Sequence, residues 1–174
     1  LSGNPIRSLP FGIHALVNRL STFTLDWSKI MFPPKSIVSK GTAMIDRFQK
    51  QCISSVDTQE LLLNKFQLDQ IPPIFNKLED TTFLDISGNM LMFFTLTKLV
   101  KLKNLNASKN QLSTLPVDIG RFLSLSNLNI SSNMLGFLPA SFSGLISLTE
   151  LTISRNRLVE LPECFTRLTK LQLL

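Results

Sequence analysis

The chain has 174 residues, of which 44% are apolar, so it is long enough to bury a continuous hydrophobic core. Its formal net charge of +6 comes from Lys and Arg residues that are scattered along the chain without a run of five or six. This pattern argues against a nucleic-acid-binding surface, and no apolar run is long enough to cross a membrane.

Apolar residues recur along most of the chain in a pattern that can be written LxxLxLxxNxLxxLPxxIxxLxx. The first copy consists of Leu1, Asn4, Ile6, Leu9, Pro10, Ile13 and Leu16. The second copy consists of Leu20, Phe23, Leu25, Ile30, Pro33 and Pro34. We therefore expect residues 1–34 to be the end of a first repeat array.

Residues 35–57 break the pattern. Met44, Ile45, Phe48 and Cys52 have helical spacing, which predicts an amphipathic helix from about Thr42 to Cys52. We interpret residues 35–57 as a helical cap on the first array, followed by a second, truncated array over residues 58–174. The alternative is an insertion within one continuous solenoid.

The second array contains five copies of the pattern, which begin at residues 58, 81, 102, 125 and 148. The Leu-x-Leu pair in each copy has the period of two that is typical of a short strand. The strands of successive copies are expected to stack into a parallel sheet, because one repeat cannot bury its own apolar face. The next conserved position of the pattern is an asparagine, which can bond backbone groups from a buried position. These asparagines are Asn89, Asn110, Asn133 and Asn156.

The pattern resembles the intracellular class of leucine-rich-repeat proteins that carry a Leu-Pro step, including Ras-pathway scaffold proteins and plant intracellular Ras-group-related repeat proteins. The resemblance implies an α/β fold: a horseshoe-shaped solenoid with a parallel sheet on the concave face and short helical or extended segments on the convex face. Leu1 and Leu174 both fall inside the pattern, so we expect the chain to be a fragment of a longer array.

The two cysteines, Cys52 and Cys164, do not form the cysteine clusters that cap extracellular members of this class, which favours a cytoplasmic location. Two glycosylation sequons, at Asn106 and Asn129, argue weakly for secretion. We interpret both as chance matches in a sequence that is rich in Asn and Ser.

Catalytic, metal-binding and cofactor-binding motifs are absent from the sequence. Its single histidine, His14, is expected to be a surface or structural residue rather than a catalytic base, and Cys52 falls on the apolar side of the predicted helix. We therefore expect no enzymatic activity in this segment, no bound metal and no cofactor.

The strand positions that point away from the core are the best candidates for partner binding. The candidate residues are Trp27, Phe83, Asp85, Asn104, Asn106, Lys109, Asn127, Asn129, Glu150, Thr152 and Arg155. The leading hypothesis is a protein-binding module or scaffold in intracellular signalling, with a small GTPase or a phosphatase among the candidate partners. The alternative is the regulatory repeat region of a larger signalling enzyme, a phosphatase, kinase or GTPase.

Overall fold

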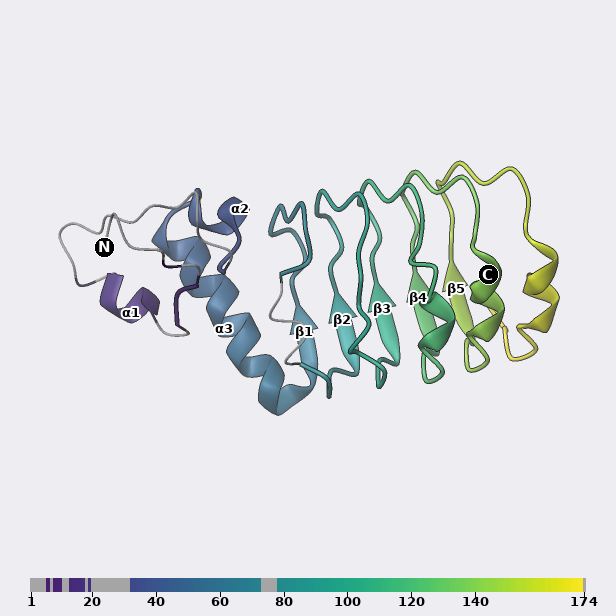
Figure 1. Cartoon of the computed structure of the whole chain (residues 1–174), viewed down its shortest axis with the longest axis horizontal. Coiled ribbons are helices and arrows are strands. Elements are labelled where there is room, and N and C mark those ends of the chain that lie inside the picture. The colour runs from purple at the N-terminus through teal and green to yellow at the C-terminus, as the bar shows by residue number, and fades with distance from the viewer. Residues whose placement is uncertain are drawn as a thin grey trace.

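The computed structural model describes residues 6, 8–10, 13–17, 19, 32–72 and 78–173. Five strands form one parallel sheet in which the strands follow one another in chain order (Figure 1). They are β1 (Glu60–Leu62), β2 (Phe83–Asp85), β3 (Asn104–Asn106), β4 (Asn127–Asn129) and β5 (Glu150–Thr152). The predicted α/β solenoid with a parallel sheet is therefore confirmed.

The strands pair without a shift in register. Glu60 lies opposite Phe83, Phe83 opposite Asn104, and the same step continues through Asn127 to Glu150. The central residue of each strand is a leucine whose side chain is at most 2% exposed. These leucines are Leu61, Leu84, Leu105, Leu128 and Leu151. The neighbouring residues on each strand point to the other face of the sheet, which is called the concave face below.

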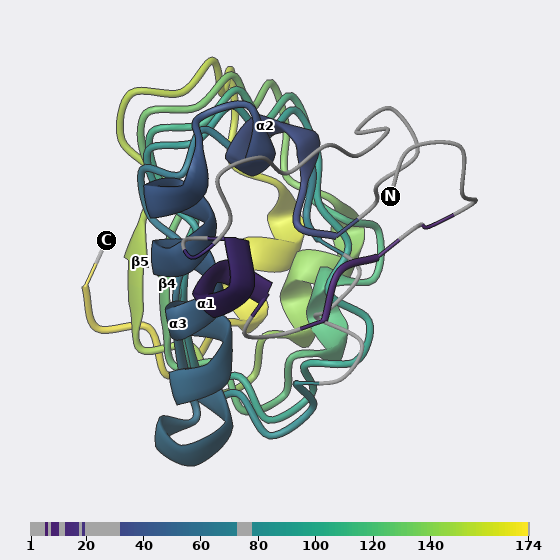
Figure 2. The same ribbon diagram turned by 90° about the vertical axis from the view of Figure 1, so that its left-hand side faces the viewer.

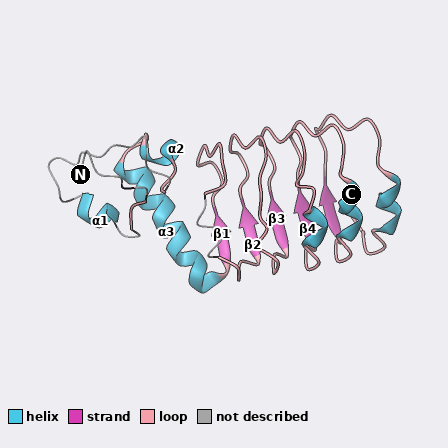
Figure 3. Ribbon diagram, viewed as in Figure 1, coloured by secondary structure: helices cyan, strands magenta, loops and turns pink. Residues whose placement is uncertain are grey.

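Short 3-10 helices lie across the core from the sheet in the last three repeats. They are η3 (Ile119–Arg121), η4 (Ala140–Gly144) and η5 (Glu163–Arg167). Viewed along the solenoid, the sheet and these helices lie on opposite sides of the coil (Figure 2). Figure 3 distinguishes the strands from the helices by colour in the side view. Helices η3 and η4 approach so closely that a Cβ atom on Gly120 would clash with the carbonyl oxygen of Ser141. Glycine therefore sets the spacing between these two turns.

Among the described residues, three α-helices precede the sheet: α1 (Ile13–Val17), α2 (Lys35–Val38) and α3 (Thr42–Thr58). Helix α3 begins where the sequence predicted but continues six residues past Cys52, so the predicted end of the helix is wrong. Its last turns carry a buried serine, Ser55, whose hydroxyl donates to the carbonyl oxygen of Cys52 at 2.8 Å. The helix ends at Thr58. Gln59 caps it: its N–H donates to the carbonyl oxygen of Ser55, and its left-handed backbone (φ 57°) turns the chain out of the helix.

The apolar face of α3 covers the β1 end of the solenoid core. Phe48 is fully buried between Phe32 and Phe66, with ring centroids 5.7 Å and 5.6 Å away. The guanidinium of Arg47 lies over the ring of Phe66, 4.5 Å from its centroid. Burial raises the pKa of the Cys52 thiol to about 12, so the thiol stays protonated near neutral pH and is a packing group.

Residues before α2 lie beside this helix as well. Ser8 forms a parallel bridge with Phe32, and the amide of Leu9 donates to the carbonyl oxygen of Phe32 at 2.9 Å. The side-chain amide of Gln49 on α3 donates to the carbonyl oxygen of Pro10 at 3.2 Å. Buried apolar residues from Phe32 to Leu168 belong to one cluster. Helix α3 therefore has core residues of both neighbouring segments packed against it.

Candidate functional site: the concave face

Two rows of side chains run across the concave face, one from the first residue of each strand and one from the last. The first row contains Glu60, Phe83, Asn104, Asn127 and Glu150. The second row contains Leu62, Asp85, Asn106, Asn129 and Thr152. All of these side chains are exposed or half-buried, so the structure brings most of the predicted partner-binding residues together on one surface.

The second row is held in place by serines two residues further along each chain segment. The Oδ1 atom of Asn106 accepts from the Ser108 amide at 3.2 Å and from the Ser108 hydroxyl at 2.8 Å. Asn129 is bonded in the same way to Ser131, at 3.1 Å and 2.7 Å. Because each oxygen faces its serine, the NH₂ group of each amide must face the other way.

This arrangement supplies a structural reason for the two Asn-x-Ser sequons. In each of them the serine fixes the asparagine side chain in an Asx turn. Asp85 occupies the same place in β2, and its Oδ1 atom accepts from the Ser87 amide at 2.8 Å. The row therefore presents a carboxylate, two amide NH₂ groups and the Thr152 hydroxyl in sequence along the sheet.

The first row differs along its length. Asn127 donates to the carboxylate of Glu150 and accepts from the Ser126 hydroxyl at 2.7 Å, so its amide is already paired. Phe83 and Asn104 are half-buried, and neither side chain makes a hydrogen bond or ring contact with the described residues. A shallow groove of about 230 Å³ runs between the two rows and includes Phe83, Asn106 and Asn129 in its lining.

A third row lies at the carboxyl ends of the strands and carries the cations Lys65, Lys109 and Arg155, all exposed. Every residue of this row has a left-handed backbone, including Gly88 at φ 64° and Lys109 at φ 55°. The choice of residue in this row is therefore limited by the backbone, which favours glycine or asparagine here. Lys109 and Arg155 nevertheless place positive charge along this edge of the concave face.

The four asparagines of the pattern lie behind the strands in a shared hydrogen-bond ladder. Asn133 accepts from the Leu112 amide at 3.0 Å and donates to the carbonyl oxygens of Ala107 and Ile130, both at 3.0 Å. Asn110 also donates to Ala107, and Asn156 also donates to Ile130. Each carbonyl thus links the asparagines of two successive repeats. The side chains of Asn89, Asn110 and Asn133 are buried, and Asn156 is half-buried.

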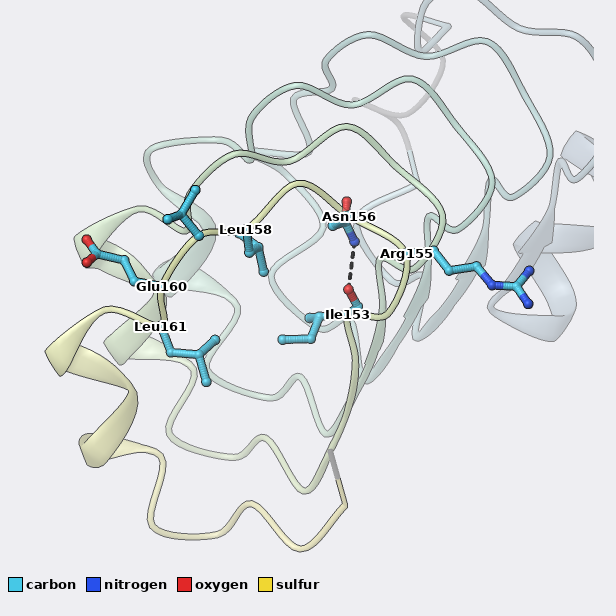
Figure 4. A pocket seen from close by; sticks show the side chains of 7 residues that line it. Ile153, Arg155, Asn156, Leu158, Glu160 and Leu161 are labelled. Carbon is cyan, nitrogen blue, oxygen red and sulfur yellow. Dashed lines mark hydrogen bonds between the residues drawn. The ribbon is translucent and has the colours of Figure 1, made fainter.

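The last repeat is open on the side facing the chain end. A hollow of about 420 Å³ lies there, with Ile153, Leu158 and Leu161 on its lining (Figure 4). Asn156 donates to the carbonyl oxygen of Ile153 at its margin, and Arg155 points away from the hollow (Figure 4). In the earlier repeats the equivalent space is filled by the next turn of the core, so this hollow is the uncovered side of a repeat.

Trp27 lies outside the described residues, as do the side chains of His14 and Cys164. Within the described ranges, no group of three or more His, Cys, Asp or Glu side chains is arranged to hold a metal ion. Among the described helices, none has the length and apolar character needed to span a membrane.

Comparison with known proteins agrees with this architecture. The family model described as Leucine Rich Repeat matches residues 124–145 and 147–168. No curated protein matches the chain in sequence.

Several solved structures are similar. The leucine-rich-repeat domain of a Shigella effector is 30% identical, with a TM-score of 0.55 over 68% of this chain and 51% of that one. YopM from Yersinia enterocolitica is 28% identical, with a TM-score of 0.56 over 68% of this chain and 25% of that one. A leucine-rich-repeat protein of Leptospira interrogans shares the fold at 23% identity, with a TM-score of 0.52 over 60% of this chain and 33% of that one.

This chain thus spans between a quarter and about half the length of these similar chains. The matched repeats, the five stacked strands and the asparagine ladder identify the chain as a leucine-rich-repeat protein.

Proposed function

We propose that this chain is a protein-binding module or scaffold in intracellular signalling, and that it binds its partner through the concave face. Leucine-rich repeats commonly mediate protein–protein interaction, which supports the general assignment. The observation that carries the specific proposal is the groove in which Phe83 lies beside two amide NH₂ groups that their serines hold in one orientation.

Preorganisation is the physical argument for this face. Strand backbones and Asx turns fix the positions of Phe83, Asn106 and Asn129 before a partner arrives, so that binding has little ordering entropy to overcome. Phe83 offers apolar area, and the two amides offer donors for carbonyl or carboxylate oxygens. The cations Lys109 and Arg155 favour an acidic partner and make association dependent on salt. A cytoplasmic small GTPase or phosphatase is the partner class that we propose.

The proposal can be tested with a concave-face variant that combines Phe83→Ala, Asn106→Asp and Arg155→Gln. Asp85 already occupies the equivalent Asx turn, so the aspartate should fit the fold while it removes the NH₂ donor. Recovery of native partners from cell lysate, measured by quantitative mass spectrometry, should fall at least roughly tenfold, because hot-spot residues dominate interface energies.

A convex-face variant with Leu123→Ala, Ser124→Asp and Arg167→Gln makes the same change in net charge at exposed positions. Circular dichroism should show both variants folded. Partner recovery should be unchanged in the convex-face variant. Loss of partners in the convex-face variant alone, or equal recovery by both variants and the parent chain, would contradict the proposal.

A further inference from the structure

A patch of exposed apolar side chains lies on the segments that leave the carboxyl ends of the strands, along the upper edge of the solenoid in Figure 1. We call it the rim patch, and its members are Met90, Met92, Phe93, Met134 and Phe137. Phe93 is 62% exposed and Phe137 is 60% exposed. Single exposed apolar residues are common, but exposed phenylalanines and methionines that recur along one edge of the solenoid are typical of an interaction surface.

The core explains why these side chains face outward. Leu91 and Phe94 are buried on either side of Met92 and Phe93, so the two residues between them are turned toward solvent. Phe137 likewise lies next to the buried Leu138. The apolar residues that fill the core are thus already supplied by other positions, and the rim patch is not needed for packing.

The rim keeps the register of the sheet. The amide of Met90 donates to the carbonyl oxygen of Leu68 at 2.8 Å. In the same way, the amide of Gln111 donates to the carbonyl oxygen of Leu91, and the amide of Met134 donates to the carbonyl oxygen of Leu112, both at 2.9 Å. Successive repeats therefore stack here at the spacing of neighbouring strands. Met90, Met92 and Phe93 form one apolar group, and Met134 and Phe137 form a second group two repeats away.

The repeat between the two groups is polar, with Gln111, Ser113 and Thr114 at the matching positions. The charged residue on the rim segment of this repeat is Lys109, which is exposed. The exposed cations Lys65, Arg155 and Arg157 lie in the outer repeats, together with the anions Asp69 and Glu160. The centre of the rim therefore combines two apolar groups with positive charge and has no acidic side chain of its own.

The spacing of the two groups indicates the shape of a ligand. Two strand spacings amount to about 10 Å. Residues i and i+7 of an α-helix lie on one face and are separated by about 10.5 Å along its axis. An extended chain covers about 10 Å in three residues, but residues i and i+3 of a strand point to opposite faces. A helix that lies along the rim can therefore place apolar side chains on both groups at once.

From this geometry we propose that the rim patch binds an acidic amphipathic helix of a partner protein. The apolar face of the helix would cover the two apolar groups, and its acidic side chains would lie toward Lys109 and the neighbouring cations. This site shares the cations Lys109 and Arg155 with the concave-face proposal, but it uses neither Phe83 nor the asparagine rows, so the two proposals can be tested separately.

The probe is a fluorescein-labelled, stapled helical peptide of about 18 residues, or about five turns. It carries Leu and Phe at positions i, i+4, i+7 and i+11 and Glu on the flanks of this face. A second peptide has Lys in place of every Glu. Fluorescence anisotropy with the full 174-residue chain should show that the acidic peptide binds at least roughly tenfold tighter than the basic one.

A rim variant with Met92→Ser, Phe93→Ser and Phe137→Ser should weaken binding of the acidic peptide at least roughly tenfold. The single change Phe137→Glu should also weaken binding of the acidic peptide, because it places a negative charge against the glutamates of that peptide. This single variant provides an independent test if the triple variant is too unstable to be measured. The matched control variant carries Val117→Ser, Leu123→Ser and Ile146→Ser at other exposed apolar positions, and it should bind as the parent chain does.

Four results would overturn the proposal: no binding of the acidic peptide, equal affinity for the basic peptide, equal affinity of the rim variant and the parent chain, or an equal loss in the control. The single concave-face change Phe83→Ala should keep the peptide affinity of the parent chain, because it leaves Lys109 and Arg155 in place. A loss there as large as in the rim variant would show that no separate rim site exists, whereas failure of the rim test alone leaves the concave-face proposal standing.

Discussion

Asn133→Ala is expected to destabilise the solenoid far more than the removal of an exposed asparagine. The change leaves the buried Leu112 amide without its acceptor, which costs about 1–3 kcal/mol. The carbonyl oxygens of Ala107 and Ile130 each lose one of two donors, which adds about 0.5–1.5 kcal/mol each. Urea denaturation followed by circular dichroism measures the loss.

The matched control is Asn104→Ala, because Asn104 is a half-buried asparagine of the concave face whose side chain makes no hydrogen bond within the described part of the chain. Its removal should change the free energy of unfolding by about 0.5 kcal/mol or less. Similar effects of the two changes would mean that the asparagine ladder does not stabilise the repeats.

Phe48→Ala is expected to lower the free energy of unfolding by about 3–5 kcal/mol, the range for truncation of a core aromatic. Phe48 is fully buried and lies between the rings of Phe32 and Phe66, so its loss opens a cavity where α3 meets the first strand of the sheet. We propose that residues 35–57 form a helical unit between residues 1–34 and the array of residues 58–174, and this contact joins that unit to the array. Thermal and urea unfolding measure the effect.

Val56→Ala on the same helix provides the comparison, since Val56 is 69% exposed. It should shift the free energy of unfolding by no more than about 0.5 kcal/mol. If Phe48→Ala were as mild as Val56→Ala, α3 would not be closing the β1 end of the core.

The register of the sheet could be predicted from the sequence because the Leu-x-Leu pair marks both the strand and its buried side. The pairing of Phe83 with Asn104 follows from that pattern alone. The inward asparagine could be predicted for a similar reason, since a polar residue at a fixed place in an apolar repeat needs buried partners. These signals are local: the apolar pair recurs in all five copies of the second array, and the asparagine recurs in four of them.

Features that depend on neighbouring repeats could not be predicted in this way. The left-handed backbone at Lys109 and Arg155 is visible in the sequence only through Gly88, which occupies the same position in one repeat. The role of Ser108 in orienting Asn106 required the hydrogen bonds themselves, although the Asn-x-Ser pattern was a signal that could have indicated it.

The exposure of Phe93 and Phe137 could not be predicted from the sequence for another reason. Apolar residues outnumber the core positions in these repeats, and only the packing shows which of them face solvent. The end of α3 was missed because Ser54, Ser55 and Thr58 weaken the apolar period, while a buried serine bonded to its own helix still continues it.

Photo-crosslinking tests most directly whether the concave face holds the partner. A benzoylphenylalanine in place of Phe83 changes one aromatic side chain for another in the groove, and the same group in place of Leu123 samples the convex side. Irradiation in cell lysate, followed by mass spectrometry, should yield one major adduct at position 83 and none of the same protein at position 123. A partner that crosslinks at position 123 and not at position 83 would contradict binding through the concave face.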